Sequence, residues 1–337
     1  MTNILGIDIS QASFTSSVFN ITNKTTSTPR SYSNNQEGFI QLAKWLQHQD
    51  LTPNSLTICL EDTGVYAEAF CYWFAAKGFP IAVEAPHKVK RAFHNPHVKS
   101  DALDSRQIAE YGYRFFDQLS YWKPVEPVLE QMKVLLSTRE QFVEQLTAQQ
   151  NSLHMLTWKV VKTPLAETAI QQTIDHLKEQ IKKIDKAVKD LISKDPGLGQ
   201  TSALLTSIPG IGLLLASNLL VLTKGFHQQI DPRQLASHLG ICPHPFESGS
   251  SIYRRPRSRH YGPPRVRKLL YLAALSMRTH NPTFKAYFLR KVQDGKSKKL
   301  VLNNISNKMI RIICAVVNSQ KPFINNYKSV NPRLLCA

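Results

Sequence analysis

The chain has 337 residues, 42% of them hydrophobic, which is enough material for a packed core and about two domains. Five cysteines without any C-x-x-C spacing argue against a disulfide framework or a zinc site and indicate a reducing compartment. The polar start leads directly into a predicted strand, and no apolar stretch is as long as a membrane span. We therefore expect a cytoplasmic protein without membrane contact.

The net charge of +18 is spread unevenly along the chain. Residues 1–120 carry 10 lysines and arginines against 11 acids, whereas residues 231–337 carry 20 against three. A basic part joined to a neutral part is typical of proteins that bind a polyanion. Nucleic acid is favoured over an anionic membrane, because the basic residues lie among Pro, Tyr and Ser and not along one amphipathic helix.

The first third of the chain alternates short strands and helices. Apolar or alternating runs predict strands at residues 3–9, 13–20, 26–33, 56–61 and 80–84. Helices are predicted after Asn35, from about Tyr66 to Lys77 before Gly78, and from a Ser100 cap to about residue 115. The resulting order, β-β-β-α-β-α-β-α, is the ribonuclease-H-like arrangement.

Four acids stand out because of where they lie on these elements. Asp8 interrupts the apolar first strand, and Glu61 ends the fourth. Asp101 and Asp104 lie three residues apart on one face of the last helix. A carboxylate at the end of an apolar strand is costly to bury unless it is paired or binds a metal. In a ribonuclease-H-like fold these elements are neighbours, so we expect the acids to converge on a hard cation such as Mg²⁺.

Two long helical patterns follow, at residues 127–156 and about 170–191. The second repeats apolar residues by four and three, which gives the narrow apolar stripe of a coiled coil. Thr163-Pro164 lies between them and breaks any continuous helix. We interpret the pair as an antiparallel helical hairpin that acts as a spacer or a dimerisation arm. Two packed helices within one globular domain explain the pattern nearly as well.

The segment Ile208-Pro209-Gly210-Ile211-Gly212 lies between two apolar helical segments and resembles a helix-hairpin-helix. In such a motif, Gly210 and Gly212 would let backbone N–H groups approach a nucleic-acid phosphate. A tight glycine turn between two core helices fits equally well. The basic charge downstream favours the nucleic-acid interpretation.

Residues 240–268 combine a Ser-Gly pair, several prolines and many cations. Ser248 would present a hydroxyl from a proline-bordered loop, and the cations would clamp a phosphate beside it. On residue chemistry alone, a polar loop followed by a solvated arginine-rich arm is favoured over a nucleophilic serine. An apolar helix follows at 269–277, and residues 282–320 add a basic helical region. The predicted nucleic-acid-binding side chains are Arg254, Arg255, Arg257, Arg259, Arg265, Arg267 and Lys268.

Taken in order, these motifs resemble the DEDD transposases of the insertion-sequence 110 family. Each motif is weak alone, but the ordered set is specific, and it extends from about residue 3 to residue 320. The resemblance implies a RuvC-like domain at 1–120, a coiled-coil hairpin at 121–197, a mainly α-helical transposase domain at 198–325 and a tail at 326–337. The motifs are Gly6-Ile7-Asp8-Ile9-Ser10, Leu60-Glu61-Asp62-Thr63-Gly64-Val65-Tyr66, Lys99-Ser100-Asp101-Ala102-Leu103-Asp104, Pro209-Gly210-Ile211-Gly212 and Glu247-Ser248-Gly249.

The resemblance also implies an activity, that of an RNA-guided DNA recombinase. Asp8, Glu61, Asp101 and Asp104 match the acids that hold Mg²⁺, and Ser248 matches the serine that becomes joined to DNA. The implied partners are donor and target DNA, a structured guide (bridge) RNA that pairs with both, and further copies of the chain in a dimer or tetramer. The implied location is the bacterial cytoplasm, in association with the nucleoid.

Two other functions stay open at this point. One is a RuvC-like structure-specific nuclease or Holliday-junction resolvase, which would use the acids alone for hydrolysis. The other is a non-catalytic nucleic-acid-binding scaffold, which would need neither the acids nor Mg²⁺.

Overall fold

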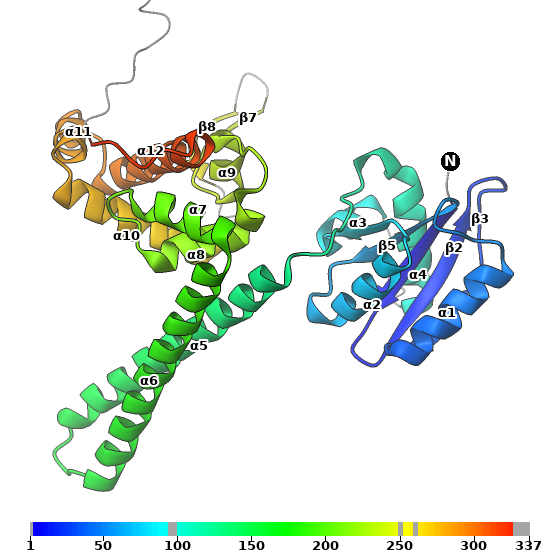
Figure 1. Cartoon of the computed structure of the whole chain (residues 1–337), viewed down its shortest axis with the longest axis horizontal. Coiled ribbons are helices and arrows are strands. Elements are labelled where there is room, and N and C mark those ends of the chain that lie inside the picture. Colours follow the sequence, from blue (N-terminus) through cyan, green and yellow to red (C-terminus); the bar gives the residue numbers. More distant parts are fainter. Residues whose placement is uncertain (1–2, 94–99, 249–251, 259–261, 326–337) are drawn as a thin grey trace, which may run out of the picture. The chain divides into compact units, whose positions relative to one another are not determined.

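The structure is a computed structural model of the whole chain, and it describes residues 3–93, 100–248, 252–258 and 262–325 (Figure 1). The chain divides into two compact units, residues 1–124 (unit 1) and residues 125–337 (unit 2). Unit 1 is mixed α/β, and unit 2 is mainly helical. The predicted class is confirmed at this level, while the RuvC-like and coiled-coil assignments stay predictions.

A six-stranded sheet forms the centre of unit 1. The strands run in the order β3-β2-β1-β5-β6, and β4 also pairs with β2. β1 is antiparallel to β2 and parallel to β5, which is parallel to β6. This mixed sheet is consistent with the predicted ribonuclease-H-like arrangement. The strands are β1 (Asn3–Ile9), β2 (Ser13–Asn20), β3 (Thr25–Thr26), β4 (Arg30–Ser33), β5 (Leu56–Glu61) and β6 (Ile81–Glu84).

The predicted third strand, at residues 26–33, is two strands in the structure. β3 pairs with the far end of β2 at Phe19 and Asn20, and β4 pairs with its beginning, from Ser13 to Ser16. Pro29 lies between the two segments and has no N–H to donate to a ladder. The single-strand prediction is therefore wrong at this point.

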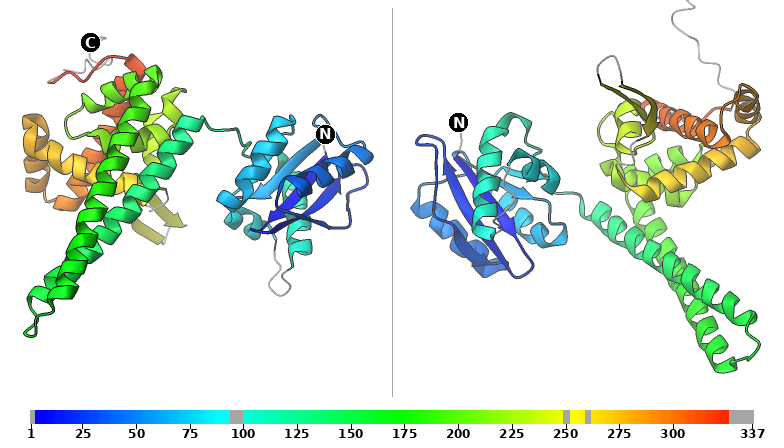
Figure 2. Two further views of the ribbon diagram at one scale, coloured as in Figure 1. Left: turned by 60° about the horizontal axis from the view of Figure 1, so that its bottom comes forward. Right: turned by 180° about the vertical axis from the view of Figure 1, so that it is seen from behind.

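Helices cover both faces of the sheet. α1 (Gln36–His48) and α2 (Val65–Ala76) pack on the face that carries Leu5 and Ile7. α3 (Pro86–Ala92) and α4 (Asp101–Arg114) pack on the opposite face, followed by the short 3-10 helix η1 (Phe116–Gln118). The right-hand view of Figure 2 shows α4 lying over the strands. The sheet is thus buried on both sides, as its apolar strands require.

The predicted caps of unit 1 are confirmed. The Asn35 side chain accepts a hydrogen bond from the Gly38 N–H at 3.0 Å, and the Ser100 hydroxyl accepts one from the Leu103 N–H at 3.3 Å. Gly78 follows the end of α2 with φ +83°, a left-handed conformation that suits glycine. Local side chains therefore determine where α1, α2 and α4 begin or end.

Unit 2 begins with the predicted helical hairpin, α5 (Pro127–Thr157) and α6 (Pro164–Lys194). The two helices lie side by side in Figures 1 and 2. Arg139 of α5 pairs with Asp185 of α6 at 2.6 Å. At the base of the hairpin, Met132 and Val188 join the core formed by the later helices.

The remaining helices of unit 2 share one hydrophobic core. α12 (Lys298–Ser319) contributes many residues to this core, and its Ile305, Met309 and Ile313 are fully buried. By length and composition alone, α12 is long and apolar enough to cross a membrane, whereas the sequence was expected to hold no such stretch. In the fold, 56% of the most apolar 18-residue stretch of α12 is buried. The helices are α7 (Pro196–Thr206), α8 (Leu213–Leu222), η2 (Lys224–Phe226), α9 (Pro232–His238), α10 (Pro264–His280), α11 (Pro282–Gln293) and α12 (Lys298–Ser319).

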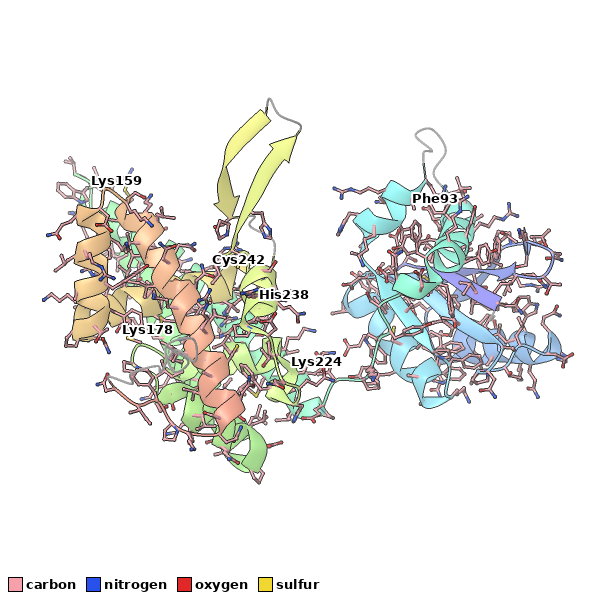
Figure 3. The ribbon with its side chains drawn as sticks, turned by 90° about the horizontal axis from the view of Figure 1, so that it is seen from above. Phe93, Lys159, Lys178, Lys224, His238 and Cys242 are labelled. Carbon is pink, nitrogen blue, oxygen red and sulfur yellow. The ribbon has the colours of Figure 1, made fainter. Side chains whose placement is uncertain are left out.

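A β-hairpin occupies the segment that the sequence predicts as a loop and a solvated arm. β7 (Pro243–Ser248) pairs antiparallel with β8 (Ile252–Ser258), so the loop prediction is wrong for these residues. The register shifts between His244 and Phe246, beside Pro245, which lacks a ladder donor. In Figure 3 the hairpin extends from the helices of unit 2 just after Cys242.

Candidate active site

Asp8 and Glu61 lie beside each other at the carboxyl ends of two neighbouring parallel strands. The β1–β5 register pairs Ile7 with Leu60, so Asp8 and Glu61 are the next residues along. Side chains alternate along a strand, so Asp8 shares a face with Gly6, and Glu61 shares a face with Cys59. Cys59 packs with residues of α4, so both carboxylates belong to the face that α4 covers. Both residues are half-buried.

Gly6 sets the close approach of α4 to β1. A Cβ atom at Gly6 would lie 2.2 Å from the Ser105 carbonyl oxygen and 2.3 Å from the Ala109 nitrogen. A Cβ at Gly112 would lie 2.7 Å from the Ile4 side chain. α4 therefore runs opposite to β1, and its amino end lies toward the carboxyl end of the strand, where Asp8 is.

The amino end of α4 carries the other two acids. Asp101 is exposed and Asp104 is half-buried, both in the first helical turn after the Ser100 cap. One turn further on, the buried hydroxyls of Ser105 and of Ser17 on β2 are hydrogen-bonded at 2.9 Å, which fixes the helix against the sheet. Carboxylates in a first turn also stabilise the helix through its dipole. Asp101 and Asp104 thus have a structural role beside any catalytic one.

The neighbouring acid on β6, Glu84, forms its hydrogen bonds within the fold. Glu84 pairs with Glu61 in the β5–β6 register, and only 1% of its surface is exposed. Its carboxylate accepts hydrogen bonds from the Ser120 N–H at 2.8 Å and from Lys88 Nζ at 2.8 Å. These bonds stabilise a buried charge that would otherwise be costly.

Asp62, which follows Glu61, forms a local turn. It is exposed, and its carboxylate accepts a hydrogen bond from the Gly64 N–H at 3.0 Å. Such an Asx turn needs no metal. Of the two adjacent acids, Glu61 belongs to the face that carries Asp8.

Cys59 lies beneath the acids and is fully buried. Burial, together with the negative charges of Glu84 and Glu61, raises the pKa of its thiol well above the usual range. A thiol that stays protonated is a poor nucleophile and a poor metal ligand. Cys59 therefore serves packing and not chemistry.

The four predicted acids are all oxygen donors, which suits a hard cation such as Mg²⁺. Within the described part of the chain, however, no group of three or more His, Cys, Asp or Glu side chains is close enough to hold a metal ion. The structure places the acids on neighbouring elements of one face without closing them around a common point. The donor chemistry of the four acids fits such a cation.

The predicted serine lies in the other unit. Ser248 is the last residue of β7 and pairs with Ile252 of β8. The arginines at positions 254, 255 and 257 belong to β8, and Arg259 lies outside the described residues. The hairpin thus places the serine and three of the predicted phosphate-binding residues on two paired strands.

The two arginines that open α10 make contacts within the protein. Arg265 donates a hydrogen bond to the Leu136 carbonyl of α5, and its Nε lies 3.4 Å from Glu140. Arg267 donates to the Leu239 carbonyl at 3.0 Å. Both are half-buried, whereas Lys268 is exposed. The internal contacts of Arg265 and Arg267 account for their presence by themselves, and Lys268 is the more accessible to a phosphate.

The two glycines of the predicted helix-hairpin-helix differ in their surroundings. Gly210 has φ +85°, and a Cβ there would lie 2.8 Å from the Ala273 carbonyl oxygen of α10. Its close approach is therefore to another helix. Gly212 precedes α8 as a cap residue with open space around it. The backbone near Gly212 is the part that an outside phosphate can approach.

Sequence patterns did not single out a hollow between α11 and α12. It is lined by aromatic and cationic side chains, among them Tyr287 and Arg290 of α11 and Lys308 of α12. The spacing of Tyr287 and Arg290 on one helix face was a usable signal. Lys308 is distant in sequence, so only the fold brings it beside them.

Comparison with known proteins agrees with this arrangement. A family model for DEDD transposases, described as "Transposase", matches residues 5–157, and a model described as "Transposase IS116/IS110/IS902 family" matches residues 202–289. The pilin gene-inverting protein of Moraxella lacunata is 27% identical over 323 residues, which span 95% of this chain and 97% of that protein. The transposase for insertion sequence element IS1111A of Coxiella burnetii is 24% identical over 279 residues, or 74% of each chain.

The acid-bearing sheet and these matches define the class of the protein, a transposase and thus an enzyme of DNA recombination. The two family models together match the greater part of the chain, in the order of its two units. The chain belongs to the IS110 family of transposases.

Proposed function

We propose that this transposase is an RNA-guided DNA recombinase that cuts and rejoins strands through a Mg²⁺-dependent acidic site and a serine–DNA intermediate. The observation that carries the proposal is the placement of Asp8 and Glu61 at adjacent strand ends, under the helix that begins with Asp101 and Asp104. Unit 1 is taken to be RuvC-like and the α5–α6 hairpin to be a coiled coil.

The acids would hold Mg²⁺, which supplies a Lewis acid that polarises the scissile phosphate when bound. The Ser248 oxygen would attack phosphorus while its proton passes to a nearby base. The bond from phosphorus to one nucleotide oxygen breaks, and that strand leaves with a free hydroxyl end. A hydroxyl end of the partner strand later attacks the same phosphorus and releases Ser248. No outside energy source is needed, because one phosphodiester is exchanged for another.

Asp8→Asn tests the acidic site. The substitution removes one negative charge with little change in shape, and we expect DNA cleavage to fall by about 100-fold or more. Asp62→Asn is the matched control, since the exposed Asp62 forms only a turn beside the site. Equal activity of the two variants in a cleavage assay, with both proteins folded, would remove Asp8 from the mechanism.

The guide RNA is tested by sequencing the nucleic acid that copurifies with the protein. The basic charge of residues 231–337 supports an RNA partner, because backbone phosphates supply most of the affinity for such a surface. Sequence choice would then come from base pairing and not from side chains. We expect one enriched, structured RNA; its absence would contradict the guided mechanism and leave DNA cleavage untouched.

Hydrolysis by the acids alone is the second candidate function. It is favoured by one observation, that all four acids belong to unit 1, which forms a compact fold of its own. A nuclease of this kind would keep cutting DNA after Ser248→Ala. A serine recombinase would lose both the adduct and the strand transfer.

A further inference from the structure

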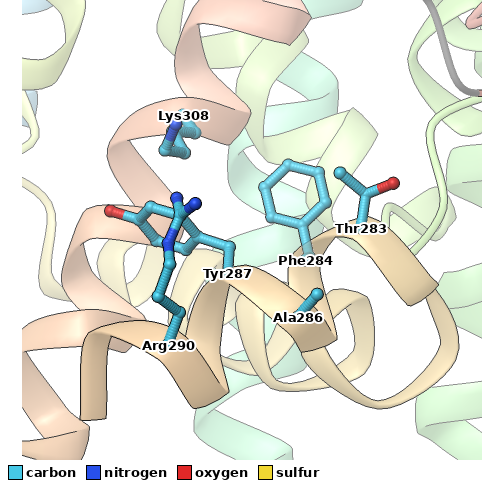
Figure 4. A pocket seen from close by; sticks show the side chains of 6 residues that line it. All are labelled: Thr283, Phe284, Ala286, Tyr287, Arg290 and Lys308. Atoms are coloured by element: carbon cyan, nitrogen blue, oxygen red, sulfur yellow. The ribbon is translucent and has the colours of Figure 1, made fainter. Parts of the chain in front are cut away.

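A groove runs between α11 and α12, at the end of unit 2. It consists of two adjoining hollows of about 620 and 770 Å³ that share Thr283, Phe284 and Lys308. We call it the α11–α12 groove and define it by Phe284, Tyr287, Arg290, Lys308, Arg311 and Phe323. Figure 4 shows Lys308 of α12 facing Tyr287 and Phe284 of α11.

Aromatic rings and cations are interleaved along this groove. Lys308 Nζ lies 4.6 Å from the centre of the Tyr287 ring, and the Arg290 guanidinium carbon lies 6.0 Å from it. Phe284 and Tyr287 are half-buried, whereas Arg290, Lys308 and Arg311 are exposed. The rings thus form a floor against the core, and the cations stand at its rim.

The far wall of the groove is fixed by hydrogen bonds. The segment after α12 carries Lys321 and Phe323, and the Phe323 N–H donates to the Ser207 hydroxyl at 2.9 Å. Asn281 donates to Asn325 at 3.2 Å. The groove is therefore held by three separate segments of the chain.

Among the residues that the structure describes, no carboxylate lines the groove. The nearby acid Asp294, at the end of α11, accepts a hydrogen bond from Lys291 at 2.7 Å. Of the side chains in the described ranges, those lining the groove offer a ligand four cations, Arg290, Lys308, Arg311 and Lys321, and no anion. Charge complementarity therefore requires an anionic ligand.

The rings restrict the kind of anion. A free phosphate or a duplex backbone would use the cations and leave the aromatic floor unused. An unpaired nucleic-acid strand uses both, because its bases stack on aromatic faces while its phosphates contact the cations. Cation–π contacts such as that of Lys308 with Tyr287 hold ring and charge in a fixed relation.

We propose that the α11–α12 groove binds an unpaired segment of a DNA strand during recombination. Strand transfer frees strand ends that stay unpaired until they are rejoined, and the groove would hold such an end. This role deepens the proposed recombinase function and rests on it in one respect, since recombination would supply the unpaired strand. Most of the groove lies beyond residue 289, where the second family model ends its match.

Binding is measured on the full-length protein by fluorescence anisotropy, without catalysis. The probes are labelled oligonucleotides of about 16 nucleotides, the upper end of known single-strand sites, as single-stranded DNA, duplex DNA and single-stranded RNA. Tyr287→Ala is expected to weaken single-stranded DNA binding by about 5- to 100-fold, the usual loss for one stacked base. Duplex binding is expected to change by less than about 2-fold.

Three variants separate stacking from folding. Tyr287→Phe keeps the ring and should keep the affinity. Tyr271→Ala removes an exposed tyrosine of α10 that lies outside the groove, and it should have no effect. Lys308→Gln and Lys285→Gln compare a groove cation with an exposed cation of α11 outside it. Only the Lys308 variant should lower the slope of log affinity against log salt, by about 0.7 for one phosphate.

The outcomes distinguish the possible occupants. A selective loss of single-stranded DNA binding in Tyr287→Ala, restored in Tyr287→Phe, supports the proposal. Equal losses on single-stranded and duplex DNA, or no loss in either the Tyr287 or the Lys308 variant, overturn it. If Tyr287→Ala weakens the binding of single-stranded RNA more than that of single-stranded DNA, the assignment of the groove to DNA is overturned. Since no cleavage is measured, a failed recombinase mechanism would not change these results.

Discussion

Gly6 lies under α4 without a side chain, and this contact fixes how closely Asp101 and Asp104 approach β1. The atoms above Gly6 are backbone atoms of Ser105 and Ala109, which cannot rotate away. The hydrogen bond between Ser105 and Ser17 holds the same turn from the next strand. The position of two predicted metal ligands thus depends on a residue that carries no functional group.

Gly6→Ala is expected to lower the free energy of unfolding by about 1–3 kcal/mol, because the added methyl group forces the helix away from the sheet. Gly199→Ala is the control: Gly199 lies inside α7, and a Cβ there meets only ordinary contacts. That substitution should be neutral or stabilising. Urea unfolding measures both, and equal stability of the Gly6 variant and the parent would contradict the tight contact.

The buried thiols of unit 1 predict a loss of stability in alkali. Burial raises the pKa of Cys59, and burial with the charges of Asp62 and Glu68 raises the pKa of Cys71 to about 12. As pH rises through the ordinary value of 9.0, the unfolded thiols release their protons while the folded ones keep them. The free energy of unfolding then falls by about 1.4 kcal/mol per thiol for each pH unit above that value.

Urea unfolding at several pH values on either side of 9.0 measures the slope of the free energy of unfolding against pH. The double variant Cys59→Ala/Cys71→Ala isolates the contribution of the thiols from that of lysines, which titrate at higher pH. The slope should be smaller in the double variant. An unchanged slope would show that the thiols do not contribute.

At the scale of elements, periodicity and caps were sufficient for most of unit 1 and for the hairpin. The bounds of β1, β2 and α5 follow closely from apolar spacing and from Pro127. α6 begins earlier than predicted, at Pro164 and not at about residue 170. The caps Asn35 and Ser100 mark helix starts because their side chains bond to the first turn. These signals are local, so a single sequence contains them.

The elements that sequence did not reveal depend on distant partners. The strands β7 and β8 are held by pairing with each other across residues rich in proline and arginine, which carry little strand preference. The 26–33 strand divides because both of its parts pair with β2. Asp8 and Glu61 were found from their places on apolar strands, and Asp101 and Asp104 from their spacing on one helix. The hydrogen bonds of Glu84 with Ser120 and Lys88 could be seen only in the fold.

The tip of the α5–α6 hairpin is unusually apolar for an exposed surface. Trp158, Val160, Val161 and Leu165 are 77%, 96%, 79% and 82% exposed. Such a patch marks an interaction site, and a second copy of the chain fits the need of a recombinase to hold two duplexes together. The tip is therefore the surface through which we propose that oligomers form.

The double substitution Val160→Glu/Val161→Glu places charge at this tip and is expected to shift the protein toward monomers in size-exclusion chromatography with light scattering. Lys189→Glu, on the exposed side of α6, adds negative charge away from the tip and should leave the oligomer intact. An oligomer that survives both changes would place the interface elsewhere.

Across the whole molecule, the acids and the serine belong to different units, one nearly neutral and the other basic. The acids lie in unit 1, and Ser248 lies in the strongly basic remainder of the chain. A nuclease needs only the acids of unit 1. Strand exchange also needs an atom that stays bonded to the phosphate of the cut strand until a second strand attacks it. We propose that Ser248 supplies this atom and that the acids activate it.

The role of Ser248 is tested by mass spectrometry of the protein after reaction with DNA, Mg²⁺ and its copurified RNA. Denaturation and digestion should yield the peptide that contains Ser248 with a nucleotide phosphate attached, and Asp8→Asn protein should yield none. Ser250→Ala, which removes a neighbouring hydroxyl, should still yield the adduct. Cleaved DNA without any linked peptide, or a linkage to a different residue, would show that Ser248 is not the attacking group.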